Sequence, residues 1–415
     1  MRAEVVGVGT ELLLGQIANT NASWISERLA AIGVDVLHHQ AVGDNVERIV
    51  QALRLAAARA DVVVVTGGLG PTQDDVTRPA LAAVAGVPLV RRPELEDAIR
   101  ERFRIRGREM PDANLAQADV PRGGRYIPPE RGTAPGLVVR VDGATVYALP
   151  GVPSEMREML EGAVLPELAE AAGPAALVWR TLRCFGLAES RIAELLEDLY
   201  LGSANPTVAY LAGGGEVHVR LAAKAASAEE AQALLDPLER SVRGRLGDHL
   251  YGTGGDGLEV VVGRLLAERG LTLACAESLT GGGLGELITA VPGASAYFLG
   301  SAVTYSSQAK RSVLGVSAST LEGPGPVSRE CAAEMAAGAR RVFGAGVAAA
   351  LTGAAGPEPH AGAEPGQVWI ALDAEGATHQ HGFRWPFDRD LVRRVAEKAA
   401  LDLLRRHLLG LRLPD

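Results

Sequence analysis

Short apolar segments alternate with amphipathic segments along the first 170 residues, and this alternation constrains the fold more than any other feature of the chain. Residues 5–8, 34–37 and 61–66 are predicted strands, of which 5–8 and the valines of DVVVVT at 61–66 are apolar runs, and two glycines directly follow the last segment. Between these runs, residues 22–32 and the segment after Asp44, which we predict as an N-cap, carry apolar residues at helical spacing. This β-α-β-α-β order predicts a doubly wound α/β domain with a parallel sheet and a site at the carboxyl ends of its strands.

The length of 415 residues is too great for one hydrophobic core, and changes in the pattern predict three domains. We expect an α/β domain over residues 1–170, a small α+β domain over 171–252 and a second α/β domain over 258–415. The glycine-rich stretch GTGGDG at 252–257 is the predicted linker before the third domain. A helix that ends at Gly270 opens that domain.

The central segment has the order of elements of a KH-like module. A strand at 178–184 leads to a helix at 189–199, two strands flank residues 213–215, and a long helix covers 229–246. The G-x-x-G backbone clamp that would hold nucleic acid is not placed between its helices, so we expect a structural or dimerising role for this domain.

Composition excludes several classes of protein. No apolar stretch reaches the roughly 18 residues of a membrane-spanning helix, and the N-terminus lacks the charged and apolar regions of a signal peptide. The three cysteines lie far apart without C-x-x-C spacing, which argues against a disulfide framework or a cysteine-rich zinc site. A net charge of −9 has the wrong sign for a protein that coats nucleic acid. We therefore expect a cytoplasmic protein that acts on small molecules.

Three glycine-rich turns follow strands of the N-terminal domain: GVGTE at 7–11, TGGLGPTQDD at 66–75 and LPGVPSEM at 149–156. Glycines after a strand let backbone N–H groups approach a phosphate. The second turn adds Asp74 and Asp75, and two carboxylates beside a phosphate require a divalent cation such as Mg²⁺ between them. Tight packing would explain any one turn, and a helix cap would explain the aspartates, but three turns in one domain favour a ligand that contains phosphate.

In the C-terminal domain, Ser278 lies where a strand at 271–275 turns into a helix opened by glycines. There a serine is either an N-cap or an exposed nucleophile beside backbone N–H groups. A second segment, VTYSSQAK, places Lys310 in the first turn of a helix, where the helix dipole lowers the pKa of an amine toward that of a general base. No histidine pattern competes, since His360, His379 and His381 are expected in a solvated loop and edge strand. Any serine–lysine pair must form through space, because Gly281 and not a lysine follows Ser278 at S-x-x-K spacing.

Two further segments complete the candidate site of this domain. The run LTGAAGP at 351–357 ends a strand in a glycine turn, and Arg389 opens the last helix. An arginine at that position is either a surface residue or a bidentate clamp for a phosphate.

The motifs GTELLLGQ-x-x-NTN, TGGLGPTQDDVT and LPGVPSEM, in this order, resemble the molybdopterin-binding-like domain of the competence/damage-inducible CinA family. The resemblance implies metal-dependent hydrolysis of ADP-ribose to AMP and ribose 5-phosphate, with Mg²⁺ or a similar ion such as Co²⁺ held by Asp74 and Asp75. Spacing alone does not separate hydrolysis from nucleotide transfer to a pterin. Carried over by position, the residues that would line the nucleotide site are Thr10, Glu11, Asn21, Gly68, Gly70, Thr72, Asp74 and Asp75.

The segments AESLTGG, VTYSSQAK, GPVS, LTGAAGP and FDRD are similar to the C-terminal domain of the same family, the nicotinamide-nucleotide amidases. The resemblance implies hydrolysis of the carboxamide of nicotinamide mononucleotide (NMN) without a cofactor, with Ser278 as nucleophile, Lys310 as base, and Tyr305 and Thr352 positioning the amide or its oxyanion. The residues that would bind the rest of NMN are Thr280, Gly281, Gly282, Ser295, Gly353 and Arg389.

The leading hypothesis is thus a bifunctional enzyme of pyridine-nucleotide salvage that uses NMN and ADP-ribose as substrates. One alternative is a pterin-related nucleotide transferase at the N-terminus with the same amidase. Another is a non-catalytic accessory protein of DNA uptake or repair, which the acidic composition and the intact serine–lysine set argue against. We expect a homodimer formed through the first two domains, and neither a membrane nor nucleic acid as a partner.

Overall fold

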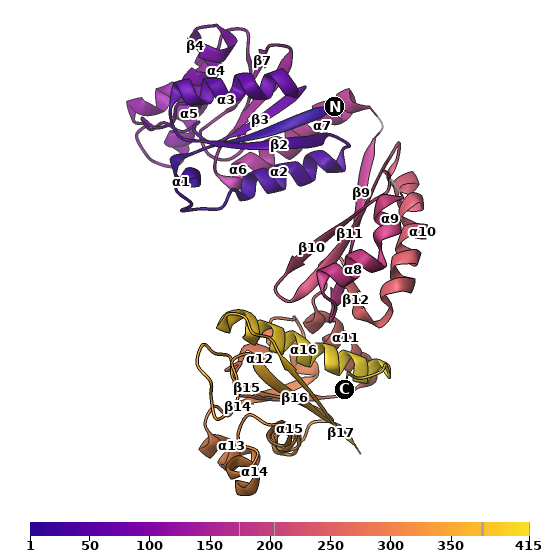
Figure 1. Ribbon diagram of the computed structural model, residues 1–415. Helices are drawn as coiled ribbons and strands as arrows, with labels where there is room; N and C mark the ends of the chain where they lie inside the picture. The colour runs from indigo at the N-terminus through magenta and orange to yellow at the C-terminus, as the bar shows by residue number, and fades with distance from the viewer. Residues whose placement is uncertain (174, 203, 375–376, 415) are drawn as a thin grey trace. The chain divides into compact units, whose positions relative to one another are not determined.

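The computed structural model describes residues 1–173, 175–202, 204–374 and 377–414 (Figure 1). It divides into two compact units, one of Met1–Val178 with Ala223–Ala233, the other of Trp179–Ala222 with Leu234–Asp415. The first holds the N-terminal domain, and the second holds the C-terminal domain and most of the central one. Over the described stretches, no helix combines the length and the apolar character needed to cross a bilayer.

The N-terminal domain is built on a six-stranded sheet in the order β2-β1-β3-β8-β7-β6. The four strands β2, β1, β3 and β8 are parallel, whereas at one edge β7 runs antiparallel to β8 and β6 runs antiparallel to β7. The parallel pairing expected around the central strand β3 is present, and the sheet departs from it only at this edge, where β7 and β8 are joined by a tight turn instead of a helix. The strands are β1 (Arg2–Val8), β2 (Asp35–Val42), β3 (Val62–Thr66), β6 (Arg125–Ile127), β7 (Gly136–Val141) and β8 (Ala144–Leu149), with β4 (Leu89–Arg91) and β5 (Asp119–Pro121) as a separate pair.

Helices cover both faces of this sheet, as predicted for a doubly wound domain (Figure 1). In the central strand β3, Val63 and Val65 pack into one core and Val62 and Val64 into the other, which explains why the run is apolar throughout. The first core is closed by α3 and α4, the second by α2 and α6. The helices are α1 (Thr10–Leu13), α2 (Thr20–Ala31), α3 (Val46–Arg59), α4 (Thr77–Ala85), α5 (Pro93–Ile105), α6 (Pro153–Met159) and α7 (Leu165–Ala172).

The start of α3 differs from the sequence prediction. Asn45, not Asp44, is the N-cap, and its side chain accepts a hydrogen bond from the Arg48 amide. The carboxylate of Asp44 instead accepts hydrogen bonds from the amide and the hydroxyl of Thr10. Asp44 therefore connects the first glycine turn to the end of β2.

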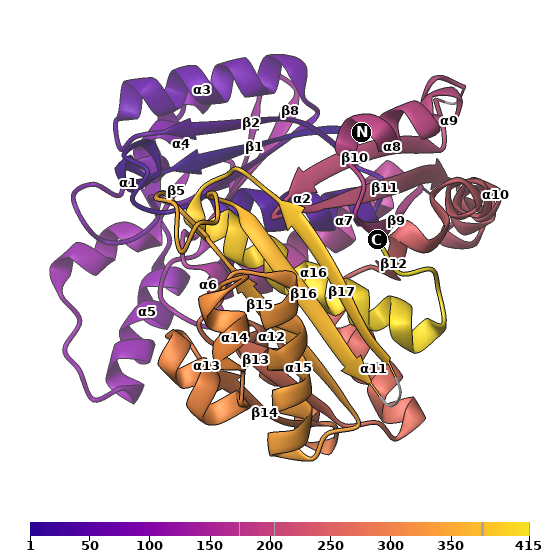
Figure 2. The same ribbon diagram turned by 60° about the horizontal axis from the view of Figure 1, so that its bottom comes forward.

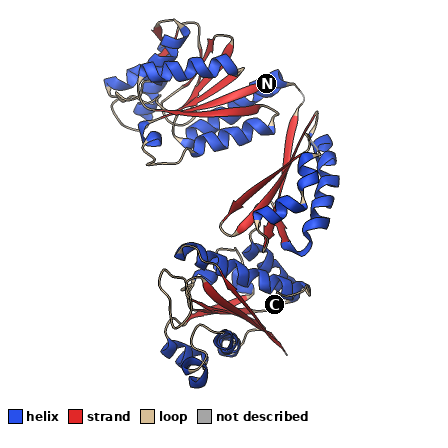
Figure 3. Cartoon of the chain, viewed as in Figure 1, coloured by secondary structure: helices blue, strands red, loops and turns tan. Residues whose placement is uncertain are grey.

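The central domain carries one four-stranded sheet in the order β10-β11-β9-β12, with its helices on one face (Figure 3). The predicted helix over 189–199 is interrupted at Leu196, and the predicted linker begins inside a strand, because β12 pairs with β9. The elements are β9 (Ala176–Phe185), α8 (Glu189–Leu195), α9 (Glu197–Leu201), β10 (Thr207–Gly213), β11 (Glu216–Ala225), α10 (Ala228–Leu246) and β12 (Leu250–Thr253).

The C-terminal domain has a five-stranded sheet in the order β14-β13-β15-β16-β17. Strands β14, β13 and β15 are parallel, whereas β16 runs antiparallel to β15 and β17 runs antiparallel to β16. Helices α11 and α16 lie on one face and α15 on the other (Figure 2). The strands are β13 (Leu273–Glu277), β14 (Phe298–Val303), β15 (Val347–Gly353), β16 (Gln367–Ala374) and β17 (Ala377–Arg384), and the helices α11 (Leu258–Arg269), α12 (Gly283–Thr289), α13 (Ser307–Leu314), α14 (Ala318–Glu322), α15 (Arg329–Phe343) and α16 (Arg389–Leu409).

Strand β13 carries the alternation that positions the second site. Leu273 and Cys275 face α11 and α16, while Ala274 and Ala276 face α15. Because both faces are buried, the strand is fixed in register, and the residues after it emerge at the carboxyl edge of the sheet. As predicted, α11 ends at Gly270 in the left-handed conformation.

Candidate functional sites in the two α/β domains

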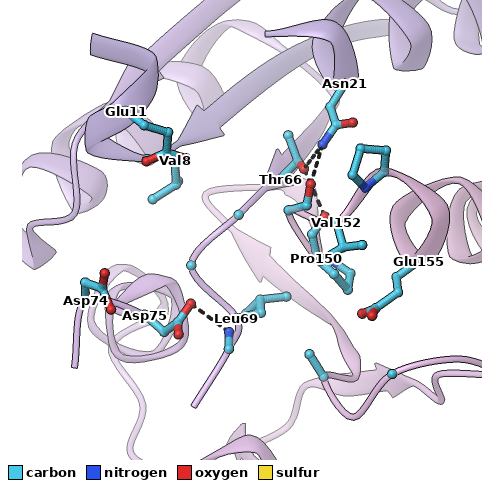
Figure 4. A pocket seen from close by; sticks show the side chains of 18 of the residues that line it. Val8, Glu11, Asn21, Thr66, Leu69, Asp74, Asp75, Pro150, Val152 and Glu155 are labelled. Carbon is cyan, nitrogen blue, oxygen red and sulfur yellow. Dashed lines mark hydrogen bonds between the residues drawn. The ribbon is translucent and has the colours of Figure 1, made fainter. Parts of the chain in front are cut away.

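The three glycine turns of the N-terminal domain meet around one cavity of ≈ 630 Å³ (Figure 4). The ends of β1, β3 and β8 supply the three turns, as expected for parallel strands whose carboxyl ends share one edge. The predicted residues that line the cavity are Glu11, Asn21, Gly68, Gly70, Asp74 and Asp75.

Backbone geometry requires glycine in the second turn. Gly67 and Gly68 have φ values of 107° and 66°, in the region that residues other than glycine rarely adopt. A Cβ atom on Gly67 would collide with the carbonyl of Val8, and one on Gly68 with the hydroxyl of Thr77. These two glycines therefore let the turn pass close to the end of β1 and to the start of α4.

Asp75 holds the same turn together. Its carboxylate accepts hydrogen bonds from the amides of Gly70 (2.8 Å) and Thr72 (2.9 Å), and from the Thr72 hydroxyl. Asp74 is exposed and lines the cavity. Of the two predicted metal ligands, Asp75 is thus engaged by the turn itself, and Asp74 is the better placed to meet an ion.

Carboxylates dominate the charge of this cavity. Glu11, Asp44 and Glu155 line it with the two aspartates, while Arg106 is the basic residue among the described lining side chains. Burial raises the pKa of Glu155 above its ordinary value, with the Glu158 carboxylate acting in the same direction. A phosphate group would be repelled here unless a cation came with it.

A divalent cation fits these residues only if water and a bound phosphate supply part of its coordination. Within the described residues, no three histidine, cysteine, aspartate or glutamate side chains converge as a metal cluster. Mg²⁺, however, is commonly held by one or two carboxylates together with water and substrate phosphates. Asp74 could therefore share a divalent ion with the phosphate of a bound ligand.

Three residues carried over from the resemblance hold the turns. Thr10 binds Asp44 as described above, and Thr72 binds Asp75. Asn21 donates through Nδ2 to the Thr66 hydroxyl (3.2 Å) and the Gly151 carbonyl (2.8 Å), so that it ties the second turn to the third (Figure 4). The LPGVPSEM motif, which sequence reasoning left without a named site residue, supplies Glu155 to the cavity wall.

In the C-terminal domain, Ser278 and Lys310 meet in a second cavity, of ≈ 570 Å³. Lys310 Nζ lies 2.8 Å from Ser278 Oγ and 2.7 Å from the carbonyl oxygen of Thr304. The lysine side chain is 1% exposed and the serine 8%. The expected pair therefore forms through space, between the end of β13 and the first turns of α13.

The Lys310 amine has the lowered pKa that a base requires. Removal from water lowers its pKa from 10.5 to about 8, because a buried ammonium loses its hydration. The direction agrees with the sequence expectation, and the largest cause is the removal of the amine from water, which the sequence analysis did not consider.

Glu277, the residue before Ser278, organises the turn that follows β13, and the sequence analysis missed it. Its side chain is completely buried and accepts five hydrogen bonds, from two hydroxyls and three backbone amides. The donors are Thr280 Oγ1 (2.7 Å), Gly282 N (3.0 Å), Leu284 N (3.0 Å), Gly285 N (2.9 Å) and Ser301 Oγ (2.7 Å). The available signal was a glutamate that ends an apolar strand directly before a glycine-opened helix start.

The Glu277 carboxylate already binds two of the residues that were expected to hold NMN. Among the described residues, the cavity lining includes Ser278, Tyr305, Thr352, Gly353 and Arg389. The remaining carried-over residues, Thr280, Gly281, Gly282 and Ser295, are not among its lining residues. Thr280 is buried against Glu277, and the Gly282 amide already has the same partner.

Tyr305 and Thr352 differ in exposure and in the hydrogen bonds that their hydroxyls make. The Thr352 hydroxyl donates to the carbonyl of Pro326 (2.6 Å), so it can offer substrate only an acceptor in this arrangement. Tyr305 is exposed, and its hydroxyl accepts from Arg389 Nη2 at 3.4 Å. Arg389 also donates to the Gly356 carbonyl at 2.8 Å.

His360 lies exposed in a loop, as the sequence analysis expected. It also lines the same cavity as Ser278, together with Glu358, which the sequence analysis did not predict. His379 and His381 lie on the edge strand β17 as expected.

Three family models match the chain in succession. A probable molybdopterin binding domain matches residues 4–170, a damage-inducible protein CinA KH domain matches 179–252, and a CinA C-terminal domain matches 256–408. The chain therefore has a three-domain arrangement of molybdopterin-binding-like, KH-like and C-terminal domains.

Full-length relatives share this arrangement in sequence. A CinA-like protein of Frankia casuarinae is 46% identical over 420 residues, which covers 99% of this chain and 97% of that protein. A putative competence-damage inducible protein of Symbiobacterium thermophilum is 47% identical over 425 residues, covering 99% of each. A solved structure of the protein CinA with unknown function from Thermoplasma acidophilum matches with 36% identity and a TM-score of 0.38, covering 40% of this chain and 97% of that one.

Proposed function

Because the chain belongs to the CinA family, we propose that it is a bifunctional hydrolase of nucleotides in which each α/β domain carries its own site. The C-terminal site would hydrolyse the carboxamide of NMN to nicotinate mononucleotide and ammonia. The observation that carries this proposal is the buried hydrogen bond of 2.8 Å between Lys310 Nζ and Ser278 Oγ in a cavity of mononucleotide size.

The serine–lysine pair can supply both proton transfers of amide hydrolysis. Neutral Lys310 takes the hydroxyl proton as Ser278 Oγ bonds to the carboxamide carbon, and returns it to the departing nitrogen, so that ammonia leaves and an ester remains. Lys310 then removes a proton from water, whose oxygen attacks the ester carbon. Lys310 returns this proton to Ser278 Oγ as the bond between that oxygen and the acyl carbon breaks, so the acid is released and the serine hydroxyl is restored without a redox partner.

The N-terminal site would hydrolyse ADP-ribose to AMP and ribose 5-phosphate. Support comes from the five lining carboxylates, which favour a phosphate ligand only when it arrives with a cation, and from glycine turns that leave backbone amides close to the cavity. A divalent ion bound by Asp74 would withdraw charge from the phosphate oxygens. Asp75 would keep the turn in shape, and Asn21 would hold the second and third turns together.

Ammonia release from NMN in excess EDTA tests the amidase. The purified full-length protein should release ammonia under chelation, and Ser278→Ala should lose this activity. Ser307→Ala, which removes a different hydroxyl from the same cavity, is the matched control. Release that persists in Ser278→Ala would refute the assignment of the nucleophile.

AMP release from ADP-ribose with added Mg²⁺ or Co²⁺ tests the N-terminal site. Asp74→Asn should lower this rate and leave ammonia release from NMN unchanged, while Ser278→Ala should do the reverse. If AMP fails to appear and the protein instead transfers a nucleotide to a pterin, the transferase alternative replaces hydrolysis.

A further inference from the structure

The start of α12 is closed to a substrate phosphate by the protein's own carboxylate. Glu277 binds the amides of Gly282, Leu284 and Gly285, which are the groups a phosphate would use at a helix start. Glu397 from α16 packs against the same turn, since a Cβ atom on Gly283 would collide with its carboxylate. A dianionic phosphate placed there would displace the hydrogen bonds of the buried Glu277 carboxylate and meet the buried Glu397 side chain beside it, so the phosphate must lie elsewhere.

The rim of the Ser278 cavity offers a different anion site. Among the described lining residues other than Lys310, those with side chains that can carry positive charge are Arg389 and His360. They come from separate segments, the first residue of α16 and the loop after β15. Both are exposed, as a site for a solvated phosphate requires.

Both side chains sit on fixed backbone. His360 and Ala363 exchange two backbone hydrogen bonds, of 3.0 and 2.9 Å, and Ala363 is buried in a cluster with Val327 and Ala354. Arg389 is oriented by its bonds to the Gly356 carbonyl and the Tyr305 hydroxyl, which use two of its five N–H groups. The remaining donors are free to bind an anion without reorganising the loop.

We propose that His360 and Arg389 together form the subsite for the anionic end of the substrate, the 5′-phosphate of NMN, in place of the glycine turn at 280–283. This inference rests on the proposed amidase function. Glu358 of the same loop lines the cavity as well, and its carboxylate opposes an anion. Removal of His360 or Arg389 should therefore weaken binding of the phosphate, whereas removal of the charge of Glu358 should strengthen it.

Kinetics with NMN and with nicotinamide riboside, which lacks the phosphate, test the subsite. A hydrogen bond to a charged group is worth about 1.5–3 kcal/mol, so His360→Ala should raise KM for NMN about tenfold or more. KM for the riboside should change less than about twofold. Glu358→Gln should lower KM for NMN, and His38→Ala, an exposed histidine of the N-terminal domain, is the matched control.

Inorganic phosphate separates failure of this inference from failure of the proposed function. Phosphate should inhibit wild-type NMN hydrolysis competitively and should inhibit His360→Ala about tenfold more weakly. Equal effects of His360→Ala on both substrates, or no effect on either, would overturn the subsite while leaving the amidase in place. If the wild-type protein releases no ammonia, phosphate binding measured by calorimetry in wild type and His360→Ala still decides whether these residues form an anion site.

Discussion

In the proposed mechanism Lys310 acts only in its neutral form, so raising the pH from 7 to 9 should increase amide hydrolysis about tenfold. With a pKa of about 8, about one tenth of the lysine is neutral at pH 7 and about nine tenths at pH 9. The rate that depends on this base should follow the neutral fraction when chemistry limits kcat/KM. The assay is initial ammonia release from NMN at low substrate concentration across this range.

The same ionisation should appear in stability. Lowering the pKa from 10.5 to about 8 means that the folded protein binds fewer protons than the unfolded chain between these values. The free energy of unfolding should therefore rise with pH through this window, and by about 3 kcal/mol in all, since tenfold in acid strength corresponds to about 1.4 kcal/mol. Below pH 8 the full cost of burying the amine is present.

Lys310→Met isolates this contribution. The substitution removes the titrating group while keeping an unbranched side chain of similar length, so the difference in unfolding free energy between wild type and variant should change across pH 8 to 10.5. Denaturant titrations at several pH values measure it, and the difference cancels other groups that titrate in the same range. A pH–rate profile that is flat or falls between pH 7 and 9, or a stability difference independent of pH, would refute the role of Lys310 as a base.

Three further substitutions test other parts of the two sites. Glu277→Gln should lower the free energy of unfolding by about 2–4 kcal/mol and reduce ammonia release, because an amide nitrogen cannot accept the hydrogen bonds that a carboxylate oxygen accepts; unchanged denaturant stability would contradict this. Asp75→Asn should reduce AMP release at every metal concentration, whereas Asp74→Asn should shift the metal dependence to higher concentration; identical metal titrations would remove the distinction. Gly68→Ala should destabilise the N-terminal domain by more than about 1 kcal/mol, because of its positive φ and the clash with Thr77, and a neutral thermal shift would argue against it.

The amino-acid sequence determined the elements whose signal is local. The run at 61–66 and the strand before Ser278 are apolar on both faces, and only a strand covered by helices on two sides buries such a run. Glycines with positive φ marked the turns at the carboxyl ends of these strands, because no other residue occupies that backbone region at low cost. These local rules predicted the α/β class, the order of the domains and the three cavity-lining turns.

Local rules failed where two neighbouring residues could both cap the same helix. Asp44 and Asn45 are both good N-caps by composition, and the hydrogen bonds from Thr10 to Asp44 leave the cap to Asn45. The sequence analysis also did not predict the antiparallel edge of the N-terminal sheet. A short turn between β7 and β8 permits only antiparallel pairing, but the sequence period is the same in both kinds of sheet.

Chemistry depends on distances that the sequence does not contain. Ser278 and Lys310 are 32 residues apart, and only the adjacent placement of β13 and the β14–α13 connection brings them within 2.8 Å and buries the amine. Burial by distant segments, which no local pattern encodes, sets the pKa of that amine. Glu277, a residue that looks like the end of a strand, occupies the helix start that the motif suggested for phosphate. The sequence thus determined which residues could react, and tertiary packing decided which of them meet, in which ionisation state, and which anion sites are already filled.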